Sequence, residues 1–311
     1  MRNPISLPVR PMYLLLVFVP ASLAAELLHQ ETAVFITSGL AIIPLAALLG
    51  EATEQLAIRL GPQRGGLLNA TLGNLTELIV GFFLITAGDV AILKATLIGS
   101  IVGNLLLVLG LSFAAGGIRH KSMSFSPRTA GIHASSLLLA IAGLVVPAML
   151  VLGSPVDATA RETVSVFVAI VLMSLYVAAL AFTNITHAHL FHAPESGETA
   201  TWSSRAALIV LAVAALAVGL ESDLLVNSLH SAISALRIPT VFVGLILIPV
   251  IGNAAEHASA IFFALKNKLD ITVEIAVGSS TQVAMFGNRS DTHLPHWPYC
   301  LNCHFGPTTR P

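Results

Sequence analysis

The stretch that decides the fold is GGLLNATLGNLTELIVGFF, residues 65–83. Most of it has the composition of a membrane-spanning helix, yet Asn69, Asn74, Thr76 and Glu77 lie in its middle. An ionised carboxylate at the centre of a bilayer costs several kcal/mol even on lenient insertion scales. Such a group is retained when it is paired, protonated or bound to a cation, so Glu77 indicates a site inside the protein.

The composition predicts an integral membrane protein in a lipid bilayer. Of 311 residues, 55% are hydrophobic and only 10% are charged, whereas soluble domains carry about 25% charged residues. The net charge of −1 gives no basic surface for nucleic acid. Both cysteines lie near the end of the chain, so the membrane part has no disulfide framework.

A span needs about 20 mostly apolar residues, and the chain offers nine candidates. The first has no clear cleavage site, so we interpret it as a helix rather than a signal peptide. The seventh is short and is expected to end near Glu221 and Asp223. The nine segments are 12–28, 33–58, 65–87, 89–116, 129–152, 164–187, 205–221, 238–265 and 269–286.

Lysine and arginine are distributed unevenly between the loops. Apart from the tail, the N-terminus and the even-numbered loops hold ten of them, and the opposite side holds three. Because positive charge collects on the cytoplasmic side, the N-terminus is predicted to be inside.

The sequence of the first half of the chain is similar to that of the second half at an offset of 179 residues. The motif Gly-Asn-x-x-Glu recurs, and each copy is followed by Gly-Ser. Helix packing reuses glycine and serine, but that does not explain two Asn-Glu pairs in one register. The matching pairs are Gly65/Gly244, Gly73/Gly252, Asn74/Asn253, Glu77/Glu256, Gly99/Gly278 and Ser100/Ser279.

The motif falls in the third and the eighth predicted helices. An offset of five helices places the two copies in opposite orientations across the membrane. Inverted repeats are typical of secondary transporters, whose substrate site lies near the midplane where the repeats meet.

The paired glutamates suit a cation that competes with protons. The i, i+3 spacing is expected to put amide and carboxylate on one helix face. Two carboxylates with amide, hydroxyl and backbone oxygens suit Ca²⁺, and without the metal their repulsion and burial favour protonation. The alternative is that each glutamate is a buried acid hydrogen-bonded within a helix bundle.

Residues 65–83 with LKATLIGSIVGNLLLVLG (93–110), and the segment FVGLILIPVIGNAAEHASAIFFALKNKLDITVEIAVGSSTQVAMF (242–286), resemble two known signature repeats. They are those of the Ca²⁺/H⁺ exchangers, the CAX family of the calcium/cation antiporter superfamily. The resemblance runs from about residue 10 to 286. It implies an all-α polytopic membrane protein with one N-terminal helix and two inverted five-helix repeats. About nine of eleven expected helices are present.

The resemblance also implies a domain organisation. The linker has only Glu195 and Glu198 where the family often has a strongly acidic segment, so regulation through an acidic loop is not expected. The predicted parts are an extra transmembrane helix (1–30), the first five-helix repeat (31–187), a cytoplasmic linker (188–204), an incomplete second inverted repeat (205–286) and an atypical non-membrane tail (287–311).

Carried over by position, Glu77 and Glu256 would be the cation and proton ligands. Lining the site beside them would be Asn74, Asn253, Ser100, Ser279, Asn104 and Gln282. Weaker candidates for proton coupling are His257, Glu51 and Glu54. The alternative for His257 is a packed polar side chain, and for the two glutamates a solvated position at the membrane interface.

The tail after Phe286 departs from the family. Cys300-Leu301-Asn302-Cys303-His304 has the C-x-x-C-H pattern of covalent haem attachment. A zinc site built from His293, His296 and the two cysteines is a further alternative. Neither has a fold around it, so we expect a truncated or out-of-frame end. An inactive fragment of an exchanger is therefore one alternative for the whole chain.

The leading hypothesis is an antiporter that exchanges Ca²⁺ for H⁺ by alternating access, not an enzyme. Ca²⁺ is then a transported substrate, no resident cofactor is expected, and a homo-oligomer is compatible with the sequence. Alternatives are selectivity for Mn²⁺ or Na⁺, a redox protein built on the tail, and an intramembrane enzyme. The weak linker and the short N-terminal extension favour a bacterial cytoplasmic (inner) membrane over a vacuolar one.

Overall fold

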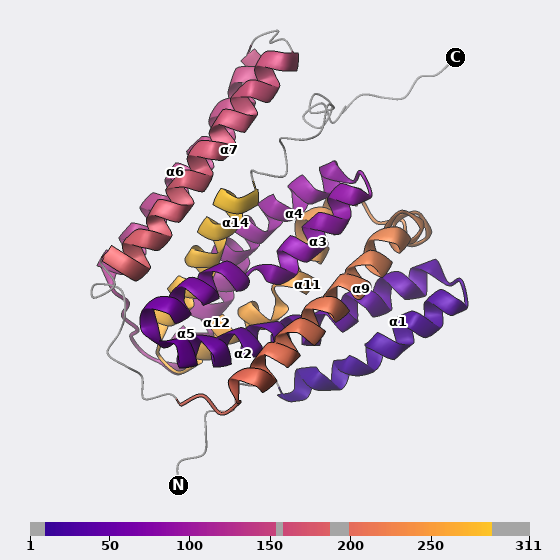
Figure 1. The fold of residues 1–311 in the computed structure, drawn as a ribbon, viewed down its shortest axis with the longest axis horizontal. Coiled ribbons are helices and arrows are strands. Elements are labelled where there is room, and N and C mark those ends of the chain that lie inside the picture. Colours follow the sequence, from indigo (N-terminus) through magenta and orange to yellow (C-terminus); the bar gives the residue numbers. More distant parts are fainter. Residues whose placement is uncertain (1–9, 154–157, 187–198, 288–311) are drawn as a thin grey trace.

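The computed structural model describes residues 10–153, 158–186 and 199–287, and every regular element in this part is a helix (Figure 1). Linker residues 188–198 and the cysteines and histidines of the tail lie outside the described residues. The predicted all-α class of the fold is confirmed for the described part.

The first half is a series of long helices with short connections. It begins with a 3₁₀ helix that leads into α1. Gly61 has φ 78° and ψ 174°, so α2 is two helices joined at that residue. The pair α6 and α7 lies side by side along one side of the molecule (Figure 1). The elements are η1 Arg10–Val17, α1 Phe18–Leu27, α2 Glu31–Leu72, α3 Leu75–Thr86, α4 Val90–Val102, η2 Gly103–Val108, α5 Leu109–Arg119, α6 Pro127–Gly153, α7 Ala158–Ala181 and η3 Phe182–Thr186.

The second half begins with α9, whose N-cap Ser203 accepts a hydrogen bond from the Ala206 amide at 3.1 Å. The helix ends at Leu236, its C-cap Arg237 is left-handed with φ 53°, and Pro239 follows. The elements are α9 Ser204–Leu236, α10 Thr240–Phe242, η4 Val243–Leu247, α11 Ile248–Gly252, α12 Ala254–Leu265, α13 Leu269–Val273, η5 Glu274–Gly278 and α14 Ser279–Gly287. The elements η2 to η5 are π-helical turns.

The predicted end of the seventh segment near Glu221 is wrong. Helix α9 continues to Leu236, and Glu221 lies in its middle with only 2% of its surface exposed. Its carboxyl Oε1 lies within hydrogen-bonding distance of Ser22 Oγ of α1, at 2.9 Å. Because a partnered acid can be buried inside a helix, the acidic residues there do not mark a helix end.

Several described helices meet the requirements for crossing a membrane. Four are long and apolar enough: Glu31–Gly61, Arg64–Thr86, Val90–Arg119 and Ser204–Leu236. The pair Thr240–Gly252 and Ala254–Leu265, bent by 64°, makes a fifth if it counts as one span. Shorter apolar helices cover Met12–Leu27, Ala130–Gly143 and Val166–Ala181. Together with α13–α14 they correspond to the nine predicted segments, whose crossing of the membrane remains a prediction.

The offset of 179 residues corresponds to a repeat of local structure. Helices α3 and α12 each have 12 residues. Each follows a break at an asparagine with nearly the same backbone angles, φ −97° and ψ 23° at Asn74, φ −101° and ψ 8° at Asn253. Each is followed by a left-handed residue, Gly88 with φ 79° and Asn267 with φ 59°. The third and eighth predicted helices are therefore interrupted, not continuous.

The two halves come together where glycines remove side chains. A Cβ added to Gly99 of α4 would lie 2.1 Å from the Leu245 carbonyl oxygen of η4. A Cβ added to Gly244 would lie 2.7 Å from the Cβ of Ala95. This contact holds the segment before the break at Asn253 against α4. A buried apolar cluster beside it includes Phe35, Ile42, Leu84, Ile92, Leu225, Leu229, Val243 and Ile248.

Candidate cation and proton site

Glu77 and Glu256 occupy the same position in two repeated half-helices. Each is the third residue after the asparagine that precedes its helix, in the first turn of α3 or α12. The N-terminal end of a helix carries unpaired N–H groups and a partial positive charge, which favour negative charge there. The break in each membrane segment therefore places a carboxylate at the helix end that suits it best.

A continuous hydrogen-bonded network joins the two halves beside Glu77. Asn74 Nδ2 donates to Gln282 Oε1 at 2.7 Å, and Asn74 Oδ1 accepts from Ser279 Oγ at 3.1 Å. Ser279 Oγ also accepts from Asn104 Nδ2 at 3.4 Å. Asn104 Oδ1 lies 2.9 Å from His257 Nε2. Asn74 thus uses both ends of its amide on residues of α14.

A second contact mirrors the first. Asn253 Nδ2 donates to Ser100 Oγ at 3.3 Å and to the Pro249 carbonyl at 3.1 Å. In the repeat, Asn253 is equivalent to Asn74, and Ser100 is equivalent to Ser279. The asparagine of each half therefore meets the serine of the other half. Such an exchange of partners is what a two-fold relation between like units produces.

Three acceptor oxygens of this region are buried without a hydrogen-bond partner in the described part of the chain: Glu77 Oε1, Glu256 Oε2 and Asn253 Oδ1. The two carboxylates interact electrostatically with each other. Gly252 lies against Glu77, since a Cβ added there would be 3.7 Å from Glu77 Cγ. Leaving buried oxygens unpaired is costly, so all three atoms are suited to bind a cation, and the two carboxylate oxygens are also suited to hold a proton.

The ligand set is composed of oxygens. Among the described residues, no three His, Cys, Asp or Glu side chains come together as a metal-binding group. A divalent cation at this position would be held by two carboxylates and neutral amide or hydroxyl oxygens. That set suits a hard cation such as Ca²⁺, which takes six to eight oxygens in irregular geometry.

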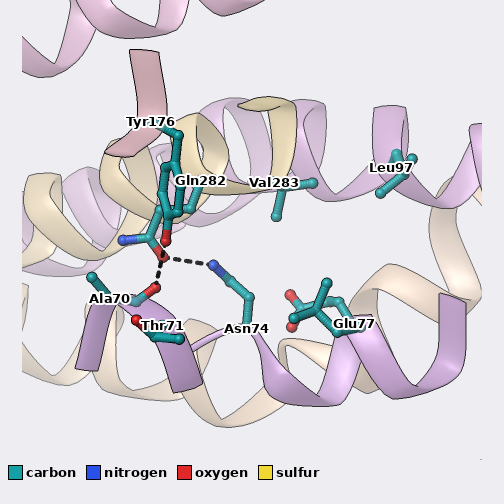
Figure 2. Close-up of a pocket in the computed structure, with 9 residues that line it drawn as sticks. Ala70, Thr71, Asn74, Glu77, Leu97, Tyr176, Gln282 and Val283 are labelled. Carbon is teal, nitrogen blue, oxygen red and sulfur yellow. Dashed lines mark hydrogen bonds between the residues drawn. The ribbon is translucent and has the colours of Figure 1, made fainter. Parts of the chain in front are cut away.

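A pocket opens next to Glu77 (Figure 2). In Figure 2 Asn74 and Glu77 lie on one wall, and Gln282 and Tyr176 face them. Tyr176 donates to the Ala70 carbonyl at 3.0 Å. Asn74 is the N-cap residue of α3, without a side-chain capping hydrogen bond, so the expected shared helix face is not formed, although both side chains still line the pocket. Its lining residues are Ala70, Thr71, Asn74, Glu77, Leu78, Leu97, Tyr176, Gln282 and Val283.

Of the three weaker candidates for proton coupling, the structure connects only His257 to the hydrogen-bonded network in the described part of the chain. His257 joins the network through Asn104. Glu51 instead accepts a hydrogen bond from Tyr13 of η1, and Glu54 is exposed on α2. Sequence reasoning missed Tyr176, because a single tyrosine in an apolar segment has no pattern that distinguishes it from packing.

Comparison with known proteins agrees with this architecture. Residues 31–184 and 206–288 match the sodium/calcium exchanger protein family. The chain belongs to this family. The predicted resemblance to cation antiporters is thereby confirmed.

Individual relatives are similar over most of their length. A Ca²⁺/H⁺ antiporter of Aphanothece halophytica is 44% identical over 293 residues, which is 88% of this chain and 78% of the relative. The Ca²⁺/H⁺ antiporter ChaA of Bacillus subtilis is 42% identical over 275 residues, covering 86% of this chain and 78% of its own. These relatives are named as transporters, so the chain is a transporter and not an enzyme.

Solved structures share the fold. The structure of native YfkE superposes with a TM-score of 0.76 at 38% identity, over 89% of this chain and 80% of its own. The crystal structure of the H⁺/Ca²⁺ exchanger CAX superposes with a TM-score of 0.67 at 17% identity, over 89% of this chain and 72% of that structure's chain. The second likeness supports the fold alone.

Proposed function

We propose that this protein exchanges Ca²⁺ for H⁺ across a membrane by alternating access at Glu77 and Glu256. The observation that carries the proposal is the mirrored placement of two carboxylates, each with one buried and unpaired oxygen, at the interface of the repeats. The relatives named as Ca²⁺/H⁺ antiporters support the choice of ions.

The chemistry follows from two carboxylates sharing one buried region. When Ca²⁺ is bound, both are ionised and balance its charge, and Asn253 Oδ1 is available as a neutral ligand. When Ca²⁺ leaves, repulsion and burial favour the neutral acid. Ca²⁺ and protons therefore compete for the same oxygens, and a pH gradient can drive Ca²⁺ in the opposite direction.

Alternating access follows from the position of the site between the repeats. In inverted-repeat transporters, one repeat rocks against the other around a site near the midplane. The contacts of Asn74 with Ser279 and of Asn253 with Ser100 both cross this interface. A rocking motion of one repeat against the other would therefore change these contacts. We also propose that the protein lies in a bacterial cytoplasmic membrane with its N-terminus inside.

The test is Ca²⁺ uptake driven by an imposed pH gradient in vesicles that contain the full chain. We expect Glu77→Gln and Glu256→Gln each to lower the initial rate by at least about tenfold, the equivalent of 1.4 kcal/mol, because each removes a charged ligand. Glu26→Gln is the matched control, since Glu26 is exposed on α1. Full transport by both site variants would show that the site is elsewhere. Competition by Mn²⁺ and Na⁺ decides the ion.

A further inference from the structure

A third buried carboxylate lies away from the site described above. Of the 33 residues of α9, seventeen precede Glu221 and fifteen follow it. At 1.5 Å per residue it is roughly 25 Å and 22 Å from the two ends of the helix. Only 2% of its surface is exposed. If α9 crosses the bilayer, Glu221 lies near the midplane.

The surroundings of Glu221 are apolar. Val218 and Leu225, one turn away on the same helix, are fully buried, and Leu45, Leu49 and Val19 belong to a cluster with Val218. The elements packed on α9 are α1, α2 and α3. In the described part of the chain, Glu221 forms no ion pair with any ionisable residue that these elements or α9 carry. Those residues are Glu26, Glu31, Glu51, Glu54, Arg59, Arg64, Glu77, Arg205, Asp223 and His230.

The hydrogen bonds around Ser22 require one proton more than the serine has. Ser22 Oγ lies 2.8 Å from the Val19 carbonyl oxygen and 2.9 Å from Glu221 Oε1. Both partners are acceptors if the carboxylate is ionised, yet a hydroxyl carries a single proton. Both contacts are satisfied if Glu221 is a neutral acid that donates to Ser22, while Ser22 donates to Val19.

The other carboxyl oxygen agrees with this assignment. Glu221 Oε2 is buried and has no hydrogen-bond partner among the described residues. An unpaired oxygen of an ionised carboxylate at this depth would carry an uncompensated charge, which is far more costly than a neutral carbonyl oxygen.

We propose that Glu221 is a further proton-binding carboxyl, separate from Glu77 and Glu256, and that its proton links α9 to the N-terminal helix through Ser22. No second carboxylate contacts it in the described part, so Ca²⁺ has no ligand set there and does not displace this proton. The inference does not depend on the proposed exchange activity.

Infrared spectroscopy of the full chain in lipid tests the proposal, because the C=O stretch of a protonated carboxyl is separate from the bands of a carboxylate. We expect the spectrum at pH 7 to lose one protonated-carboxyl band in Glu221→Gln, and that band to be the same with and without Ca²⁺. The matched control is Asp223→Asn, since Asp223 is exposed on the same helix. This control is expected to keep the protonated-carboxyl band.

Ser22→Ala gives a second readout that does not remove the acid. Loss of its hydrogen-bond partner should shift the same band while leaving its intensity unchanged. The proposal is overturned if Glu221→Gln loses a carboxylate band, or if Ca²⁺ removes the protonated band. Bands of Glu77 and Glu256 that fail to respond to Ca²⁺ would contradict the proposed function and leave this inference standing.

Discussion

Asn74 uses both ends of its amide at once, as a donor to Gln282 and as an acceptor from Ser279. We expect Asn74→Leu, which has nearly the same shape, to leave both partners unpaired at a cost of about 1–3 kcal/mol each. Because these groups position the site, the apparent affinity for Ca²⁺ should fall by about tenfold or more. The measurement is the Ca²⁺ dependence of uptake.

Thr71→Val is the matched control for Asn74→Leu. Thr71 lines the same pocket, but its hydroxyl bonds only to the Leu67 carbonyl of its own helix, at 2.8 Å. The affinity of this variant for Ca²⁺ should stay within about twofold of the wild type, because the Thr71 hydroxyl bonds within its own helix and holds no other residue of the site. Equal losses in both variants would mean that the pocket, not the Asn74 amide, determines affinity.

At single residues, the sequence was informative where a pattern repeated. The motif predicted a site that contains Asn74, Asn253, Ser100 and Ser279, and the structure brings these together in crossed pairs. It could not identify Ser22 as the partner of Glu221, because they are 199 positions apart and neither belongs to a repeated motif. Contacts of that kind depend on how helices pack, which periodicity along one helix does not determine.

Between elements, the close approach of α4 and η4 depends on Gly99. We expect Gly99→Ala to destabilise the protein by about 1–3 kcal/mol through overpacking, because the new Cβ would lie 2.1 Å from a backbone oxygen that cannot easily move. Thermal unfolding in detergent should show a midpoint lowered by several degrees. Transport should fall as well, since η4 leads to the break at Asn253.

Gly103→Ala, at the start of η2 directly after α4, controls for the general effect of replacing a helical glycine by alanine. Gly103 lies four residues further along, and nothing is within 4 Å of its added Cβ. Its midpoint should be unchanged or slightly higher, since alanine favours helix more than glycine does. A larger loss for Gly103→Ala than for Gly99→Ala would contradict the proposed role of the α4–η4 contact.

The positions of the helices could be predicted from the sequence, but whether each helix continues without a break could not. Apolar runs located the helices because each run is long and has a uniform composition. The breaks at Asn74 and Asn253 could not be predicted, since an asparagine within an apolar run does not by itself mark the start of a new helix. Helix α9 is longer than predicted for the opposite reason, because Glu221 and Asp223 resemble the polar end of a membrane segment but lie inside the helix.

Across the whole molecule, the mirrored contacts restrict how the two halves can be related. Three residues of the network are not repeated in the other half: Asn104, Gln282 and His257, whose repeat-equivalents are Val283, Gly103 and Leu78. The hydrogen bonds of the network are therefore unequal on the two sides of the interface. We expect this inequality to make one direction of rocking more favourable than the other when the site is empty.

The inverted orientation of the halves is testable with cysteines at repeat-equivalent positions. Ala87 and Lys266 follow α3 and α12 directly, and both are exposed. With Cys300 and Cys303 replaced by serine, we expect a membrane-impermeant maleimide to label Ala87→Cys only in intact cells. Lys266→Cys should be labelled only in everted vesicles, because an odd number of spans separates the two positions.

Lys121→Cys is the control for Lys266→Cys, because a contact within the fold places the two positions on the same side. His120 Nε2 lies 2.9 Å from the Leu265 carbonyl oxygen, so positions 121 and 266 are on the same face whatever the relation between the repeats. Both should be labelled from one side. If Ala87→Cys joins them on that side, the halves are not inverted. The crossed Asn–Ser contacts would then have to arise from parallel repeats, whose axis lies along the membrane normal.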